Sequence, residues 1–201
     1  MRVRIETLRG ADIRPWLDAL AALRIRVFRD FPYLYDGSAD YERDYLSGYA
    51  ESPGSVFVLA IDGDRVVGCA TGLPLAEAHA EFRQPFAQAG MAVAEIFYFG
   101  ESVLERDYRG LGIGHAFFDR REDHARRLGF SITTFCAVER AADHPLRPHG
   151  YRPLDAFWHK RSYHPAPGLI AEFSWKDVDH DHETAKTMQY WLKNHHESSP
   201  T

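Results

Sequence analysis

The sequence contains few cysteines, and this scarcity argues against a fold held together by disulfide bonds. Cys69 and Cys136 are the only two among 201 residues, and each lies inside an apolar run. Such a setting is typical of small core residues in a reducing compartment. A chain of this length also buries enough surface to be stable without cross-links. We therefore expect a cytoplasmic protein with free thiols.

The sequence also lacks a basic excess and any long apolar run. Its formal net charge is −5, with 24 Lys and Arg against 29 Asp and Glu. Nucleic acid normally requires a basic face, so we expect no nucleic-acid partner. No segment approaches the roughly 20 apolar residues that span a bilayer, and the N-terminal residues lack the apolar core of a signal peptide. We expect no membrane partner.

Strand and helix patterns follow one another in a definite order. The β-rich runs 55–61 and 65–73 flank Asp62-Gly63-Asp64, which predicts a hairpin. Residues 95–104 are apolar on both faces, as in a central strand, and a helical pattern then runs from Ile113 to a stop at Gly129. Hairpins followed by a strand–helix–strand crossover predict a mixed α/β sheet with helices on both faces.

The sequence also predicts the domain organisation. We find no internal repeat or low-complexity tract and expect one domain over residues 1–193, with a disordered polar tail at 194–201. Residues 75–89 look helical or irregular, and Pro85 is expected to interrupt any helix there.

The glycine-rich turn Arg109–Gly114 lies between the predicted central strand and the helix. Glycines let the backbone turn sharply and approach a ligand closely, and the free N–H groups at a helix start attract anions. A P-loop requires Gly-Lys-Ser/Thr, but Ile113, Gly114 and His115 follow Gly112. A dinucleotide fingerprint requires a third glycine where His115 or Phe117 stands. Both of these phosphate-binding motifs are excluded.

The turn resembles the R-x-x-G-x-G motif of the GNAT-type N-acetyltransferases. Arg109, Gly112 and Gly114 fill its fixed positions. Three further segments resemble family elements in the expected order, so the resemblance extends from residue 2 to about residue 193. They are the splayed central strand at 100–104, the end of the later helix at 157–163 and the last strand at 187–193.

The resemblance implies a mostly antiparallel sheet of about seven strands, splayed at the site of the cosubstrate acetyl-CoA. It implies an acetyl-CoA-dependent N-acyltransferase that acetylates a primary amine of a small molecule or protein, with no metal. The backbone of Val103 and Leu104 is expected to pair with pantetheine and to donate an N–H to the thioester carbonyl. The implied cofactor-binding residues are Val103, Leu104, Arg109, Gly110, Leu111, Gly112, Ile113, Gly114 and Trp158.

Glu101 is the expected general base, because many relatives carry a glutamate on this strand, eight residues before the turn arginine. A carboxylate in a half-buried apolar cleft is suited to that role. The alternative is that Glu101 binds the amine or pairs with an arginine. Glu95 and Glu105 are weaker choices, because they lie at the two ends of the strand.

The acid that protonates the leaving thiolate is the point at which the sequence departs from the family. Many relatives have a tyrosine where Trp158 stands, and an indole supplies no proton at useful pH. We name Tyr163 as the candidate acid, with Tyr98, His159 or solvent as alternatives. Trp158 is expected to form a packing wall.

Two loops complete the set of candidates. Tyr33, Tyr35 and Asp36 lie where relatives close over the acceptor, so they are expected to bind substrate, with a structural turn as the alternative. The loop 177–182 contains aspartates and histidines but no fixed ligand spacing, so a solvated loop is favoured over a metal site.

Two other function classes stay open, namely an acyl-CoA sensor with little turnover and a phosphate binder that shares only the turn. A homodimer is the default assembly.

Overall fold

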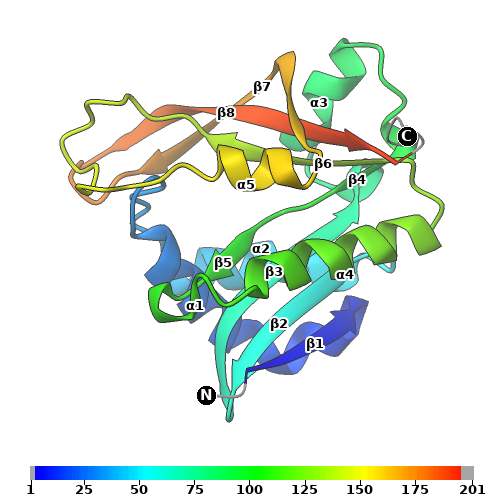
Figure 1. Cartoon of the computed structure of the whole chain (residues 1–201), viewed down its shortest axis with the longest axis horizontal. Coiled ribbons are helices and arrows are strands. Elements are labelled where there is room, and N and C mark those ends of the chain that lie inside the picture. The colour runs from blue at the N-terminus through cyan, green and yellow to red at the C-terminus, as the bar shows by residue number, and fades with distance from the viewer. Residues whose placement is uncertain (1–2, 196–201) are drawn as a thin grey trace.

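The computed structural model describes residues 3–195 of the chain. A mixed sheet runs through these residues (Figure 1). The strand order is β1-β2-β3-β4-β6-β8-β7, and β5 pairs with β3 beside β4. The β4–β6 pair is parallel and the other pairs are antiparallel, which confirms the predicted fold class. The strands are β1 (Arg4–Arg9), β2 (Val56–Asp62), β3 (Arg65–Pro74), β4 (Ile96–Tyr98), β5 (Ser102–Leu104), β6 (Ile132–Val138), β7 (His164–Lys176) and β8 (Glu183–Asn194).

Helices cover both faces of the sheet, with α4 in front and α1 and α2 behind in Figure 1. In α4, Ile113, Phe117 and Ala125 recur at helical spacing and are buried, and Gly129 (φ 86°) follows its end. No helix within residues 3–195 is long and apolar enough to cross a membrane. The helices are α1 (Leu17–Phe28), α2 (Ala39–Glu51), α3 (Ala80–Gln88), α4 (Ile113–Arg127) and α5 (Asp155–Lys160), with 3-10 helices η1 (Gly10–Trp16), η2 (Leu75–Glu77), η3 (Val93–Glu95) and η4 (Arg106–Tyr108).

The apolar residues form two cores, one on each face of the sheet. Side chains of α1 and α2, including Leu23 and Leu46, pack with Phe57 of β2 in the first core. Phe117 of α4 packs with Val58 and Phe99 in the second. The central strands are buried on both faces for this reason, as their apolar sequences predict.

The predicted strand 95–104 is interrupted, and this difference positions the site. Its two parts, β4 and β5, pair with β3 in registers that differ by one residue, so a bulge separates them. Gly100 lies in the bulge, where an added Cβ would overlap the hydroxyls of Tyr49 and Thr71. Glycine allows this close approach of the backbone.

Two other expectations were wrong in detail. Pro85 lies inside α3, and the helix continues to Gln88. The chain stays ordered past residue 193, because β8 runs to Asn194 and the backbone N–H of His195 donates to the Ser131 carbonyl at 2.8 Å. Residues 196–201 of the predicted tail lie outside the described part of the chain.

Candidate active site

The glycine turn ends in a helix start that has no cap. Gly110 (φ 78°) and Gly112 (φ 80°) adopt left-handed backbone conformations, which favour glycine. Gly112 is the N-cap of α4, no side chain caps the helix, and its first turn has no acidic residue. An added Cβ at either glycine would meet no atom within 4 Å, so the turn faces open space. Free N–H groups at a helix start, together with the helix dipole, favour the binding of an anion.

The flanks of the turn connect it to β5 and α5. The exposed Arg109 donates from Nε to the Leu104 carbonyl at 3.1 Å, which joins the turn to β5. Gly114 faces α5, because an added Cβ would lie 3.6 Å from the Phe157 ring. A cavity of about 410 Å³ opens between the turn and β1. It is lined by Val3, Ile5, Leu111, Gly112, Ile113 and Ala116.

Beyond the bulge, β5 does not pair with β6, the strand that runs parallel to β4. The three residues of β4 pair with Ile132, Thr133 and Thr134 of β6, and the Phe99 N–H donates to the Thr134 carbonyl at 2.7 Å. β5 pairs with β3 alone among the described strands, so its other edge has no strand partner. Figure 1 shows β5 diverging from β6. An extended ligand can add to such an edge as a further strand.

Glu101 lies in the bulge, with 7% of its surface exposed. Its Oε2 accepts a hydrogen bond from Thr71 Oγ1 at 2.9 Å and lies 2.8 Å from Arg24 Nη1. Arg24 Nε also donates to the buried Glu42 on α2. The arginine pairing considered from the sequence is therefore present, while the remaining oxygen, Oε1, has no hydrogen-bond partner among the described residues.

Arg121 holds the bulge from the opposite side. This arginine of α4 is 1% exposed, and its Nη1 donates to the carbonyls of Thr71 and Glu101, both at 3.1 Å. Its Nη2 donates to Ser102 Oγ at 2.7 Å. Burial lowers the pKa of Arg121 to about 10, against the raising influence of neighbouring anions, so the side chain is charged at neutral pH. The sequence analysis missed this residue.

Tyrosines surround the Glu101 side of the bulge. The hydroxyls of Tyr45 and Tyr49 lie 3.0 Å apart, and the Tyr98 hydroxyl lies 3.4 Å from Cys136 Sγ. Burial raises the pKa of Tyr33, Tyr45, Tyr49 and Tyr98, so these phenols are neutral at physiological pH. They can donate hydrogen bonds but do not add charge.

The predicted acceptor loop packs between the end of α1 and β7. Tyr33 packs its ring against Phe28 (4.5 Å between centroids) and Trp175 (6.1 Å). Asp36 is paired with Arg29 at 2.9 Å and with Lys176 at 2.6 Å, so its carboxylate is already engaged. The Tyr35 ring folds over Gly37, where an added Cβ would overlap it.

A buried ion pair fixes this loop to the far half of the sheet. Arg140, which follows β6, donates to both carboxylate oxygens of Asp177 at 2.8 and 3.0 Å. The same guanidinium donates to the carbonyls of Pro32 and Tyr33 at 2.8 and 2.7 Å. Lys186 lies 3.3 Å from Asp177, which is 2% exposed. The structure thus adds Arg140 and Asp177 to the residues that shape the site.

Tyr163 is not placed for proton transfer at the opening. It is fully buried, and its hydroxyl bonds Thr133 Oγ1 at 2.7 Å and Glu122 Oε1 at 3.2 Å. Burial and the charge of Glu122 raise its pKa well above 10. We therefore interpret Tyr163 as a core residue. The half-buried Trp158 packs against Phe135 (5.1 Å between centroids) and Trp191 (4.9 Å).

The acidic loop offers one arrangement that a metal ion could use. Asp177, Asp179 and His180 each have a ligand atom within 4.8 Å of the others. Asp177, however, is already bound by Arg140 and Lys186, and the other two residues are exposed. We assign no metal role to this loop.

Comparisons with known proteins identify the family and the fold. A sequence model described as the acetyltransferase (GNAT) family matches residues 20–148. No curated protein matches the sequence.

Many solved structures are similar to this chain, and three that match nearly its whole length serve as examples. An N-acetyltransferase from Staphylococcus aureus Mu50 has a TM-score of 0.62 at 12% identity, over 96% of this chain and 99% of that one. A ribosomal-protein-alanine N-acetyltransferase from Brucella melitensis has a TM-score of 0.60 at 13% identity, over 96% and 99%. The Salmonella typhimurium protein yncA, solved with its cofactor acetyl-CoA, has a TM-score of 0.59 at 13% identity, over 98% and 96%. At these identities the likeness shows a shared fold.

Proposed function

The chain belongs to the acetyltransferase (GNAT) family, and we propose that it transfers an acetyl group from acetyl-CoA to a primary amine of a small molecule or protein. One observation carries the proposal. The uncapped start of α4 adjoins the open edge of β5, and the Arg109–Leu104 hydrogen bond joins the two. A pyrophosphate suits the helix start, and an amide-containing arm suits the strand edge.

In this proposal the turn Arg109–Gly114 holds the pyrophosphate of acetyl-CoA through backbone N–H groups. The pantetheine arm runs along Val103 and Leu104, and a backbone N–H of β5 donates to the thioester carbonyl. Trp158 forms one wall of the channel. A donor placed at the developing oxyanion is worth about 3 kcal/mol of activation free energy.

The transfer step needs a group that receives the proton of the amine. The amine nitrogen attacks the thioester carbon, the carbon–sulfur bond breaks, and CoA leaves as a thiolate. We assign the proton to Glu101 Oε1, directly or through a water molecule. Arg24 lies 2.8 Å from this carboxylate. In this scheme Glu101 takes the first proton of the ammonium group, which frees the nitrogen lone pair for attack, and the second N–H proton passes to water as the amide forms.

The thiolate does not require a protein acid in this scheme. The thiolate of CoA is a better leaving group than an alkoxide, and because thiols have pKa values above 7, it takes its proton from water near neutral pH. Transfer can therefore proceed with Trp158 at the family's tyrosine position and with Tyr163 buried in the core.

The second candidate function is an acyl-CoA sensor with little turnover. The burial of Tyr163 and the replacement of the family's tyrosine by Trp158 favour it, because neither residue then supplies a proton to the thiolate. A panel of amines separates the two functions. Steady release of CoA, detected with a thiol reagent, supports the transferase, whereas binding of acetyl-CoA without release under any amine supports the sensor.

We further propose a cytoplasmic location, which suits the two buried free cysteines. A homodimer is the expected assembly, and light scattering coupled to gel filtration tests it.

A further inference from the structure

A second cavity lies between β1, η1 and the later turns of α4, with a volume of about 290 Å³. Val3 and Ile5 of β1 line the cavity beside the glycine turn. The next two residues on the same side of β1, Thr7 and Arg9, line the second cavity. Figure 1 shows β1 and α4 running in the same direction, so the two cavities follow one boundary between strand and helix.

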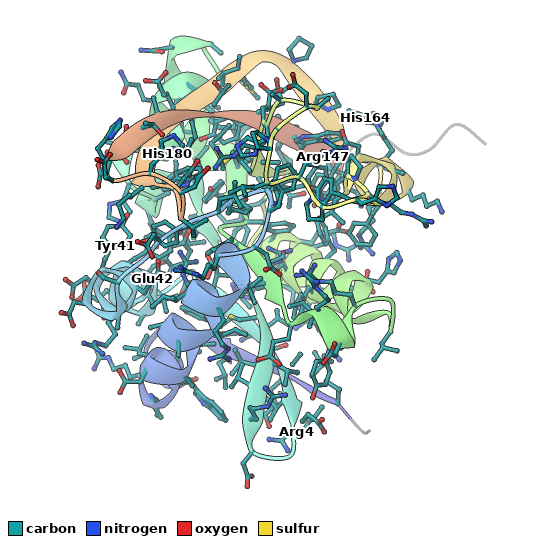
Figure 2. The ribbon with its side chains drawn as sticks, turned by 90° about the vertical axis from the view of Figure 1, so that its left-hand side faces the viewer. Arg4, Tyr41, Glu42, Arg147, His164 and His180 are labelled. Atoms are coloured by element: carbon teal, nitrogen blue, oxygen red, sulfur yellow. The ribbon has the colours of Figure 1, made fainter. Side chains whose placement is uncertain are left out.

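The second cavity is separate from the glycine turn. Its first residue on α4, Arg120, follows Gly112 by eight positions, which corresponds to about 12 Å along a helix axis. β1 is an edge strand of the sheet and β7 is the strand at the other edge. Figure 2 shows Arg4 of β1 and His164 of β7 at opposite ends of the molecule. The cavity therefore lies outside the site assigned to acetyl-CoA.

Three arginines line this cavity without a partner. The side chains of Arg9, Arg120 and Arg127 are exposed and make no hydrogen bond or ion pair with the described residues. The end of a helix attracts cations, which accounts for Arg127. It does not account for Arg9 on β1 or for Arg120, which lies about two turns earlier on the same face of α4. Like charges that line one cavity repel each other, and a bound anion removes that repulsion.

The cavity is basic, although the protein is acidic. The whole chain has a formal net charge of −5. Asp123 lines the cavity but is paired with Arg126 on the same helix. Asp12 is then the one carboxylate of the lining that has no ion pair with the described residues, and it faces three guanidinium groups. The lining therefore attracts anions.

A buried histidine contributes to the wall of the basic cavity. His124 is 6% exposed, and its Nε2 lies 2.9 Å from the Gly54 carbonyl oxygen. A carbonyl only accepts, so Nε2 carries a hydrogen, whereas Nδ1 has no hydrogen-bond partner among the described residues. Burial lowers the pKa of His124, the hydrogen bond to Gly54 opposes this shift, and the charges of Arg9 and Arg127 add to it. An anion in the cavity would counter the two arginines and favour a protonated Nδ1 that can donate.

We propose that the basic cavity binds a phosphate group, carried by free phosphate or by a small phosphate ester. This site goes beyond the acetyl transfer proposed above and does not depend on it. Guanidinium groups hold phosphate oxygens through paired hydrogen bonds, and the Thr7 hydroxyl offers a further donor. The volume is close to the lower limit of about 300 Å³ for small-molecule pockets, so a small organic group fits beside the phosphate.

The test is a titration of the full chain with inorganic phosphate at constant ionic strength, followed by NMR of the arginine Nε–H groups and the histidine rings. We expect saturable shifts at Arg9, Arg120 and Arg127 and a rise in the pKa of His124. A parallel titration with glycerol 1-phosphate distinguishes the two sources, because tighter binding of the ester identifies a ligand with an organic part. Shifts that do not saturate with either probe overturn the proposal.

Arg120→Gln is the informative variant, because it removes one guanidinium from the lining. We expect the affinity for inorganic phosphate to fall by about tenfold or more, as for the loss of a charge-assisted hydrogen bond. Arg14→Gln is the matched control, because Arg14 is an exposed arginine of η1 that does not line the cavity. An equal loss in the two variants would show a general attraction of anions to surface charge and would contradict a specific site.

Saturating acetyl-CoA separates this site from the proposed active site. We expect the affinity for inorganic phosphate to stay the same when acetyl-CoA is bound. Loss of phosphate binding under these conditions would assign the cavity to the phosphates of the cosubstrate and would overturn a separate site. A protein that binds phosphate here but releases no CoA with any amine keeps this site and loses the proposed acetyl transfer. A protein that acetylates amines but shows no saturable phosphate binding keeps the transfer and loses this site.

Discussion

The two oxygens of Glu101 have different environments, and this difference defines its role. Oε2 is fixed by Thr71 and Arg24, whereas Oε1 is free of hydrogen bonds from the described residues. A carboxylate held on one side has little rotational freedom, so its free oxygen points in a set direction. Fixed orientation of this kind is what proton transfer and amine binding both require.

The first prediction concerns this free oxygen. Glu101→Gln keeps the hydrogen-bond acceptor for Thr71 but removes the charge and basicity. We expect kcat to fall by roughly 10²–10⁴-fold, the usual loss for a general base. Glu105→Gln is the control, because Glu105 pairs with Arg26 and Arg65 at the surface and should keep its activity. A change confined to KM would show that Glu101 only binds the amine.

The second prediction separates ligand binding from backbone strain at the glycine turn. Gly112 (φ 80°) and Gly129 (φ 86°) flank opposite ends of α4, and an added Cβ at either meets no atom within 4 Å. Alanine at each position should cost a similar amount, about 1 kcal/mol of stability. Only Gly112→Ala should weaken acetyl-CoA binding, by about tenfold or more, as expected when a charge-assisted hydrogen bond of about 1.5–3 kcal/mol is lost. Calorimetric titration of both variants checks this, and equal affinities would remove the turn from the site.

At the scale of elements, local signals in the sequence were sufficient for the glycine turn and the order of strands and helices. The helix start after Gly112 and the stop at Gly129 depend on residues that are close in sequence. The bulge also had a local signal, because an isolated glycine in a strand, here Gly100, marks such a feature.

The partners of the site residues could not be predicted in the same way. Arg24 and Glu101 are 77 positions apart by their numbers, and the pairing of Arg140 with Asp177 depends on how β6, β7 and β8 fold together. Nothing in a single sequence distinguishes a buried arginine from an exposed one. The buried location of Tyr163 was missed for the same reason, since it depends on Thr133 and Glu122.

The third prediction concerns the Arg140–Asp177 pair, which fixes the acceptor loop. Asp177→Asn removes the charge and leaves the guanidinium without its counterion. We expect the free energy of unfolding to fall by about 3–5 kcal/mol, as for other broken buried pairs. The KM for the acceptor should rise because the Tyr33 carbonyl depends on the same arginine, while acetyl-CoA affinity should not change. Asp179→Asn is the control, because it changes an exposed carboxylate two positions after the buried Asp177.

The pH dependence of stability provides a separate check on this pair. Burial alone would raise the pKa of Asp177, but the hydrogen bond and charge of Arg140, with Lys186, hold it below the usual value of 3.8. A lowered pKa in the folded state stabilises the fold fully above the unfolded value, about 3.9, and the stabilisation is lost as pH falls through the folded pKa. The stability difference between the native protein and Asp177→Asn should therefore be constant above about pH 5 and shrink below pH 4. A difference that does not change between pH 3 and pH 7 would contradict this.

At the scale of the whole molecule, the sheet has a narrow waist at β4. Two residues of β4 pair with β3 and three with β6, whereas the strands on either side pair over much longer stretches. The half that contains β1, β2, β3 and β5 thus connects to the half that contains β6, β8 and β7 through one short strand, and the opening between β5 and β6 lies beside it (Figure 1). We expect acetyl-CoA bound along β5 to touch both halves.

The last prediction follows from this waist. Acetyl-CoA at 100 times its Kd adds about 2.7 kcal/mol to the free energy of unfolding, which raises the Tm of a domain of this size by roughly 5–10 °C. If residues 3–195 form one domain, thermal unfolding should stay a single transition, and acetyl-CoA should shift that transition to a higher temperature. We expect this because the bound pantetheine arm contacts both β5 and β6. Amide exchange should slow at Val103 and Leu104 and also along β6, while ATP and NAD at the same concentration should leave Tm and exchange unchanged. Two transitions, of which acetyl-CoA moves only one, would show that the halves unfold separately. Equal protection by ATP would show that the turn binds phosphates without recognising pantetheine. That outcome would favour the phosphate binder, the alternative that the sequence leaves open.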